Sequence, residues 1–360
     1  MKIPFTLILP AALLIASCGK TPDSSINNTT IPPGGPTVAT FAGTGSPGSY
    51  DGTKELASFN EPTQIAIDGI GFFYVADREN NAIRRISPQG VVNTIAGSLT
   101  AGFSNKTDSI TFSSPSGIAV NSGANYIYVA DEGNNAIRVI ADLQLGSTLA
   151  GNGSQGYVNA SDTAARFYAP TSVAIDSSGN VYVADNGNNV IRKISSKGAV
   201  TTLAGSGYRG IVDGTGTAAA FNQPTAICID VAGNIYVADT GNSEIRKITP
   251  QGVVTTIAGN GTAGLKDGKF TDSELSQPQG VALDANGNLF VGDTGNNVIR
   301  KISLATGSII TFAGSGQLGS ANGSLGTATF NSPEGLVVDS FGRIFVCDTG
   351  NDMIRVITQE

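Results

Sequence analysis

The sequence predicts an all-β protein built as a closed ring of six sheets, each with four antiparallel strands. The pattern D-x-x-N-x-x-I-R occurs six times, at steps of 54 residues with a last step of 55. A second pattern, T-[I/L/F]-A-G, also occurs six times, but its series starts before the first octapeptide and stops before the last one. Self-similarity at such a period is typical of repeat architectures. The octapeptides are residues 77–84, 131–138, 185–192, 239–246, 293–300 and 348–355.

Each repeat predicts four strands. From Pro224 the chain reads PTAICID, VAG, NIYVAD, TGNS, EIRKI, TPQG and VVTTIAG, so runs rich in Val, Ile and Tyr alternate with turn residues. The D-x-x-G-N segments, such as residues 176–180, suit tight hairpins in which glycine takes a positive φ. The octapeptide forms the second hairpin, with Asp and Asn bonding turn amides and Arg reaching a neighbouring carboxylate or carbonyl. We interpret it as structural rather than catalytic.

The order of the repeated strands predicts how the ring closes. The first T-x-A-G strand, residues 37–43, has no partner strands before it, and the last repeat, residues 333–358, has no fourth strand of its own. Pairing residues 37–43 with residues 353–358 completes the sixth sheet and covers two open strand edges, which is the advantage of a closed ring.

Over residues 37–358 the motif A-[I/V]-D-x-x-G-N-[I/V/L]-[Y/F]-V-A-D-x-G-N-N-x-I-R-K-I resembles NHL repeats. The resemblance implies a six-bladed β-propeller of four-stranded antiparallel blades. It leaves function open, because NHL proteins include RNA-binding modules, kinase sensor domains and an amidating lyase. The lyase resembles a zinc enzyme with histidine ligands, which this chain cannot supply because it has no histidine. Related six-bladed lactonases bind a divalent cation through Glu, Asn and Asp around the channel, and those residue types are present.

Composition narrows the partners. The formal net charge is -7, and there is no histidine or tryptophan. We expect no nucleic-acid partner, because there is no excess of Lys and Arg to displace counterions from phosphates. The lack of histidine also removes the usual base at neutral pH and the commonest zinc ligand.

The first 17 residues predict an export signal, with one Lys, an apolar run and small residues before Cys18. The segment Ile15-Ala16-Ser17-Cys18 resembles the bacterial lipobox, so we expect lipid attachment at Cys18. Residues 18–36 then form the lipidated Cys and a flexible tether rich in Ser, Thr, Asn, Pro and Gly. Gly19, rather than Asp, fits sorting to the outer membrane. We expect a lipid-anchored protein of the bacterial cell envelope, on the periplasmic or surface side.

The interblade connections are long and repeat their own pattern, so we expect them to be ordered. An aromatic position should anchor each loop between blades, and a recurring Asp or Asn should cap a turn. Calcium binding by the Asp/Asn column is disfavoured, because its copies lie on different blades and calcium needs six to eight converging oxygens. The aromatic column is Phe59, Phe112, Phe167, Phe221, Leu275 and Phe330, and the Asp/Asn column is Asp51, Asn105, Asn159, Asp213, Asp267 and Asn322.

Binding candidates are sought where the repeats differ. The position after a loop glycine is Ser49, Phe103, Tyr157, Ile211, Leu265 and Ser320, with Tyr208 and Arg209 nearby. Clustered aromatic side chains on a polar face suit contact with a protein or glycan, because rings bury area at low entropy cost. The alternative is that Phe103 and Tyr157 pack the loops onto the blades.

A second variable column follows the proline that opens each innermost strand. We expect it to rim the channel on the long-loop face. Its only acid, Glu334, is the best candidate for a cation contact or a general base, and Gln279 is a further binding candidate. The column is Thr63, Ser116, Thr171, Thr225, Gln279 and Glu334.

No nucleophile–base pair, phosphate-binding loop or cysteine metal motif is found in the sequence. We therefore predict a non-catalytic binding or scaffold module without a cofactor, engaging a protein or glycan through its long-loop face and a membrane through its lipid anchor. The alternative is a hydrolase, lactonase or lyase that uses a divalent cation such as calcium at the channel mouth, with Glu334 as its catalytic residue. Cys228 and Cys347 replace alanines in different repeats, so we expect no disulfide between them.

Overall fold

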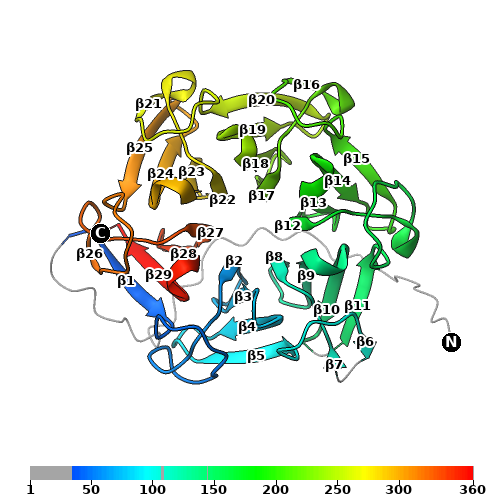
Figure 1. Ribbon diagram of the computed structural model, residues 1–360, viewed down its shortest axis with the longest axis horizontal. Coiled ribbons are helices and arrows are strands. Elements are labelled where there is room, and N and C mark those ends of the chain that lie inside the picture. Colours follow the sequence, from blue (N-terminus) through cyan, green and yellow to red (C-terminus); the bar gives the residue numbers. More distant parts are fainter. Residues whose placement is uncertain (1–34, 107–108, 144, 360) are drawn as a thin grey trace, which may run out of the picture. The chain divides into compact units, whose positions relative to one another are not determined.

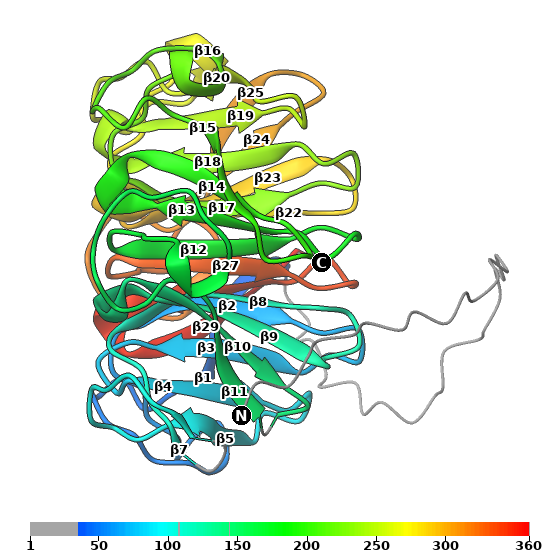
Figure 2. The ribbon, with the colours of Figure 1, turned by 90° about the vertical axis from the view of Figure 1, so that its right-hand side faces the viewer.

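The computed structural model describes residues 35–106, 109–143 and 145–359, which form a ring of six sheets around a central channel (Figure 1). The export signal, Cys18 and most of the tether lie outside the described residues. Seen from the side, the strands run between the two faces of the ring (Figure 2). Within the part of the chain that is described, no helix is both long and apolar enough to cross a membrane.

Five blades are continuous in sequence. The first has β2 (Pro62–Ile67), β3 (Phe73–Asp77), β4 (Ala82–Ile86) and β5 (Val92–Gly97). The second has β8 (Pro115–Val120), β9 (Tyr126–Asp131), β10 (Ala136–Ala141) and β11 (Leu145–Ala150). The third has β12 (Pro170–Ile175), β13 (Val181–Asp185), β14 (Val190–Ile194) and β15 (Val200–Ala204). The fourth has β17 (Pro224–Ile229), β18 (Ile235–Asp239), β19 (Glu244–Ile248) and β20 (Val253–Ala258). The fifth has β22 (Pro278–Leu283), β23 (Asn288–Asp293), β24 (Val298–Ser303) and β25 (Ser308–Ala313).

The sixth blade joins the two ends of the ring. It combines β27 (Pro333–Val338), β28 (Ile344–Asp348) and β29 (Met353–Thr358) with β1 (Thr37–Ala42). β1 pairs antiparallel with β29, with Thr37 opposite Thr358 and Val38 opposite Ile357. The predicted closure is therefore confirmed, as is the six-bladed propeller with four-stranded antiparallel blades.

Short elements decorate the loops. β6 (Asn105–Lys106) pairs with β7 (Ser109–Ile110), whereas β16 (Gly214–Thr215), β21 (Gly268–Lys269) and β26 (Gly323–Ser324) extend the outer edges of β20, β25 and β1. Turns of 3₁₀ helix lie inside five octapeptides: η1 (Glu132–Asn134), η3 (Asn186–Asn188), η5 (Thr240–Asn242), η7 (Thr294–Asn296) and η8 (Thr349–Asn351). Three more lie in the interblade loops: η2 (Asp162–Ala164), η4 (Gly216–Ala218) and η6 (Phe270–Asp272).

The hydrophobic core lies between neighbouring blades. Each of six clusters of buried side chains contains residues from two adjacent sheets. The cluster that includes Phe73 and Phe345 joins the first blade to the sixth. The small and β-branched residues of the repeats suit this face-to-face packing of twisted sheets. Cys228 and Cys347 are both free thiols, as expected, and Cys347 is fully buried.

Candidate functional site

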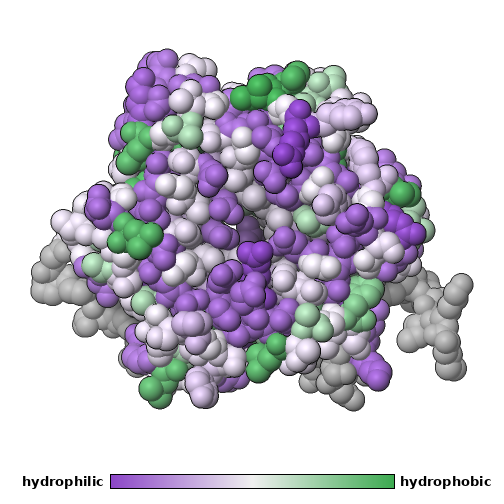
Figure 3. All heavy atoms as spheres, viewed as in Figure 1, coloured by the Kyte–Doolittle hydropathy of each residue, from purple (hydrophilic) through white to green (hydrophobic). Residues whose placement is uncertain are grey.

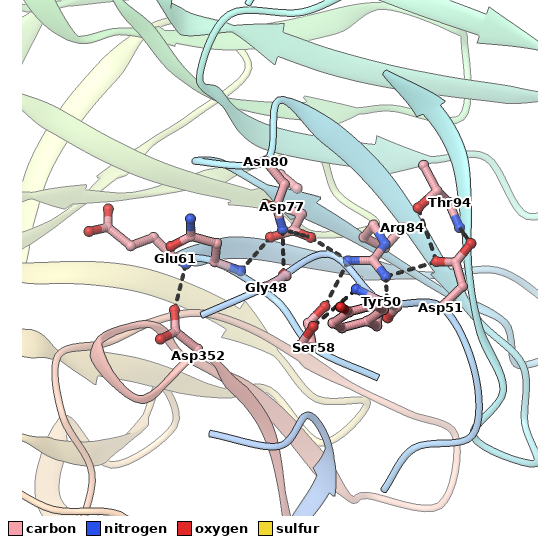
Figure 4. Close-up of polar contacts among 12 residues, drawn as sticks. Gly48, Tyr50, Asp51, Ser58, Glu61, Asp77, Asn80, Arg84, Thr94 and Asp352 are labelled. Carbon is pink, nitrogen blue, oxygen red and sulfur yellow. Dashed lines mark hydrogen bonds and ion pairs between the residues drawn. The ribbon is translucent and has the colours of Figure 1, made fainter. Parts of the chain in front are cut away.

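The octapeptide holds the long loops against the blades. In the first blade the buried Arg84 donates through Nη1 to Asp77 and through Nη2 to Asp51, at 2.8 Å from the latter (Figure 4). Asn80 donates both to Asp77 and to the carbonyl of Gly48 in the loop. All six arginines are fully buried and each pairs with the Asp of its own octapeptide. The motif is structural, as predicted, because its Asp, Asn and Arg side chains bond one another and the loop backbone.

The Asp/Asn column differs from the prediction of turn caps. Each member instead accepts a hydrogen bond from the arginine of the following octapeptide, as Asn159 does from Arg192 at 2.8 Å. The sequence pattern alone favoured turn capping, because it does not show that each interblade loop folds back onto the arginine of the following octapeptide.

The residue after the octapeptide Asn joins neighbouring blades. Asn81 accepts the backbone N–H of Ser114 in the next blade, and Asp352 accepts that of Glu61 at 2.8 Å (Figure 4). The second contact ties the sixth blade to the first. Because Asn and Asp tolerate left-handed backbone, they can sit at this turn, where Asn81 has φ 49°.

The aromatic column packs as expected. All six side chains are fully buried, and the ring of Phe167 lies 5.1 Å from the Arg192 guanidinium carbon. Two binding candidates make similar contacts from the solvent side, since Phe103 lies 4.9 Å from Arg138 and Tyr157 lies 5.1 Å from Arg192. Each leaves 42% and 43% of its surface exposed, respectively.

Tyr208 and Arg209 project more freely. Tyr208 is 82% exposed, and Arg209 is also exposed. Phe103, Tyr157 and Tyr208 lie in three successive interblade loops, whereas Gln279 and Glu334 lie at the channel. The structure therefore does not bring the six binding candidates into one cluster.

The channel mouth is a polar cavity of about 190 Å³. All six residues of the variable column that follows the strand-opening proline line it, which places Gln279 and Glu334 in one recess. Figure 3 shows strongly hydrophilic residues gathered beside the central opening, over the part of the ring where β2 and β3 lie. The full lining is Thr63, Gln64, Arg78, Ser116, Glu132, Thr171, Asn186, Thr225, Gln279 and Glu334.

Sequence reasoning missed four of these residues, Gln64 and three that belong to the octapeptides. Arg78, Glu132 and Asn186 occupy the first variable position of the octapeptide, which was set aside as structural. In the other three blades this position is threonine, and its hydroxyl bonds the carbonyl of the proline opening the next blade. The signal was present as variation inside a repeated motif: Asn186 keeps the contact by donating to the carbonyl of Pro224 at 3.2 Å, whereas Arg78 and Glu132 introduce charge at this position.

The carboxylates of the mouth are electrostatically perturbed. Burial raises the pKa of Glu334 to about 8, with Arg78 opposing the rise and Glu61 and Glu132 adding to it. Burial also raises the pKa of Glu132, opposed by Arg78 and by a hydrogen bond from Ser116. Arg78 itself lies 3.7 Å from a Glu61 oxygen and 4.0 Å from a Glu79 oxygen. Its charge is therefore partly compensated on the rim.

Below the mouth the channel changes character. Gln64 reaches across the second blade to the hydroxyl of Ser172, at 3.4 Å. Beneath it lies a cavity of about 290 Å³ lined largely by aliphatic side chains of the six innermost strands. A polar ligand entering from the long-loop face would therefore meet its polar partners only in the upper recess.

The alternative of a divalent cation at the channel mouth requires a group of metal-binding side chains. Within residues 35–106, 109–143 and 145–359, no group of three or more Asp, Glu, Cys or His side chains is arranged to hold a metal ion. The recess combines carboxylates, amides, hydroxyls and one guanidinium, and such convergent polar groups in a concave site suit binding of a small polar group.

The repeats match a known family. The NHL repeat matches residues 112–140, 167–194, 221–248 and 275–302. The chain is an NHL-repeat β-propeller. It is 32% identical over 289 residues to the Arabidopsis thaliana protein SUPPRESSOR OF QUENCHING 1, chloroplastic, covering 75% of this chain and 27% of that protein. It is 31% identical over 299 residues to chicken (Gallus gallus) NHL repeat-containing protein 2, covering 72% of this chain and 41% of the other. The NHL chain thus spans less than half the length of these relatives.

Solved structures share the fold. One is described as an auxiliary nutrient binding protein from Bacteroides thetaiotaomicron, with a TM-score of 0.68 and 17% identity over 90% of this chain and 77% of that one. At this identity the likeness shows that the two chains share the propeller architecture.

Proposed function

We propose that this NHL propeller is a lipid-anchored binding module of the bacterial cell envelope that engages a protein or glycan through its long-loop face without catalysing a reaction. The supporting observation is the polar recess at the channel mouth, which is surrounded by ordered loops whose shared motif residues are all committed to the fold. Concave sites with a few convergent polar groups recur in the mouths of β-barrels. The lipid on Cys18 would hold the module at the outer membrane.

The description of a structural neighbour as an auxiliary nutrient binding protein agrees with a binding role. The same architecture serves many functions, so the proposal rests on the site of this chain, and the description of the neighbour is only consistent with it. Tyr208 and Arg209 are the candidates best placed for partner contact, since they are exposed and no packing role engages them as it does Phe103 and Tyr157.

The function is tested by capturing envelope components on the full chain. Tyr208→Ala, alone and with Arg209→Ala, should reduce recovery of the specific partner by roughly tenfold, because exposed aromatic and Arg side chains dominate interface energetics. The matched control is Phe341→Ala, another exposed ring, at the tip of the β27–β28 hairpin on the opposite face. Equal recovery by the Tyr208 variants and the control would reject this face as the binding surface.

One observation favours the enzymatic alternative enough to test it. A carboxylic acid with a pKa near 8 is suited to proton transfer at neutral pH. A hydrolase, lactonase or lyase working at Glu334 with a divalent cation should show bound metal in the purified protein and turnover of lactone or ester substrates that Glu334→Gln abolishes. Absence of both metal and turnover would remove this alternative.

A further inference from the structure

The hydroxyl groups of the channel mouth have no hydrogen left to donate to a ligand. A Ser or Thr hydroxyl has one hydrogen and two lone pairs. Thr63 donates to the carbonyl of Ser116 at 2.8 Å, and Thr171 donates to that of Thr225 at 2.9 Å. Ser116 lies 3.1 Å from the carbonyl of Thr171 and beside the Glu132 carboxylate, so its hydrogen is engaged by either acceptor.

The direction of the fourth hydroxyl follows from its neighbour. Thr225 and Thr240 share a contact of 2.6 Å in which either oxygen could donate. Thr240 also contacts the carbonyl of Pro278 at 2.6 Å, and a carbonyl only accepts. Thr240 must therefore spend its hydrogen on Pro278, and Thr225 must spend its own on Thr240. All four hydroxyls of the recess present only lone pairs to the cavity.

The charged residues of the recess also favour a ligand that donates hydrogen bonds and carries a positive charge. Glu132 and Glu334 add two carboxylates, and among the described residues neither forms an ion pair. The one cation of the described lining, Arg78, lies 3.7 Å from Glu61 and 4.0 Å from Glu79 on the rim, and its Nε has no hydrogen-bond partner among the described residues. Besides the guanidinium of Arg78, the donors are the amides of Gln64, Asn186 and Gln279, and the first two amides already contact Ser172 and the carbonyl of Pro224. Once both acids are ionised, the recess therefore carries two negative charges against one positive charge, and its four hydroxyls only accept.

We propose that the channel mouth is a recognition site for a primary ammonium group, such as an amino sugar or a lysine side chain carries. An ammonium offers three donors and a positive charge, which match the lone pairs and carboxylates that converge here. A recess of about 190 Å³ has room for the group together with its first carbons. This inference rests on the proposed binding function and names the chemical group that the long-loop face recognises.

The arrangement favours an ammonium over the other charged ligands. A hard metal ion needs six to eight oxygens at close, fixed distances, and the described residues form no such carboxylate group. An anion could pair with Arg78, but it would also meet four hydroxyls that cannot donate and two acids. The acids lie on different blades, with Glu132 in the second and Glu334 in the sixth, which suits a group larger than a bare ion.

Binding should strengthen as pH rises. Only ionised Glu334 attracts a cation fully, and its pKa lies near 8 under the influence of burial, Arg78, Glu61 and Glu132. The affinity should therefore increase between pH 6.5 and pH 9, where an alkylammonium with a pKa of about 10.4, like that of lysine, stays charged. The raised pKa of Glu132 acts in the same direction.

The test is calorimetric titration of the full chain with n-butylammonium chloride. Separate titrations with n-butanol, sodium butyrate and calcium chloride compare a neutral ligand, an anion and a metal ion. Butylammonium should bind saturably, with Glu334→Gln and Glu132→Gln each weakening it roughly tenfold through loss of a charged hydrogen bond. Arg78→Gln should strengthen it, a gain that misfolding cannot produce. Glu55→Gln, an exposed acid outside the recess, serves as the control and should leave the affinity unchanged.

Saturable binding of butyrate, binding of calcium without binding of butylammonium, or weaker binding by Arg78→Gln would each overturn the proposal. The two proposals fail separately. If butylammonium does not bind while capture of a partner still depends on Tyr208, only the ammonium assignment is lost. If butylammonium binds as expected but the Tyr208 variants capture partners normally, the long-loop face outside the recess loses its role.

Discussion

Arg192 and its five counterparts are buried cations, and each contacts one buried Asp and a loop carbonyl. Removing a charge from water is costly, so such a pair stabilises the fold mainly because either partner alone would cost more. The loop carbonyl contacts explain the repetition, since they fix each long loop on its blade. The first variable position of the motif takes no part in these contacts, and Arg78 and Glu132 occupy it at the channel mouth.

Arg192→Met should lower the free energy of unfolding by about 3–5 kcal/mol, because Asp185 would remain as an uncompensated buried charge. The loss should be smaller at pH 5 than at pH 8. Burial already raises the pKa of Asp185 to about 6 against the opposition of Arg192, so without the arginine the acid would take up a proton more readily. Urea denaturation at both pH values measures the difference.

The double variant Asp185→Asn/Arg192→Met serves as the internal check, since it removes the orphaned charge and should recover part of the loss. Arg209→Met, at an exposed arginine, should change stability by less than about 0.5 kcal/mol. A loss that is independent of pH, or no recovery in the double variant, would argue against an electrostatic origin.

At the scale of single strands, the spacing of the innermost strands determines where the channel residues lie. Two positions after the opening proline, three blades carry glycine and the others carry larger residues. A Cβ at Gly280 would meet the backbone oxygen of Glu334 on the neighbouring blade, whereas Ala226 fits at the same place in the fourth blade. β22 and β27 therefore approach closely, and this approach sets the position of Glu334.

Gly280→Ala should destabilise the protein by about 1–3 kcal/mol, because β27 must move away from β22 to admit the methyl group. The same movement should weaken butylammonium binding, since it displaces Glu334. Denaturation and the titration above measure the two effects. Gly326→Ala, where the added Cβ meets nothing within 4 Å, is the matched control, and equal behaviour of the two variants would contradict the spacing argument.

In the molecule as a whole, the ring is closed by hydrogen bonds and packing between two strands from opposite ends of the described chain. β1 occupies the place that a fourth strand fills in every other blade. In the fourth blade, the segment Pro250–Gly252 connects the equivalent third and fourth strands. Thr358 and Thr37 face each other in the same way, with hydroxyl oxygens 3.0 Å apart.

A circular permutant should therefore fold to the same ring. Joining Thr358 to Thr37 through Pro-Gln-Gly copies the native hairpin, and new ends between Pro250 and Gln251 fall at an exposed turn. With residues 1–36 placed before Gln251, the unfolding free energy should stay within about 2 kcal/mol of the parent value, because the blade interfaces are unchanged. Circular dichroism and denaturation test the fold. A permutant without a cooperative transition would show that closure depends on the native order of synthesis or folding.

The repeats made the architecture predictable from sequence. Six copies of one strand-and-turn pattern, out of phase at the two ends, require the same local structure six times and a shared last blade. They also placed Glu334 and Gln279 at the mouth, because a residue next to the strand-opening proline occupies the same place in every blade. Phe103, Tyr157 and Tyr208 could be assigned to loops, but not to packing or exposure.

The fold, the closure and one ring of channel residues thus followed from the repeats, since each depends on periodicity and alternation along the chain. Only the tertiary structure brought Glu132 and Arg78 into the recess with Glu334, because they belong to different blades and to a motif that is structural elsewhere. It alone decided which way the hydroxyl hydrogens of Thr63 and Thr171 point, since their acceptors lie about 54 residues away in the next blade. The character of the mouth arises from these contacts between blades.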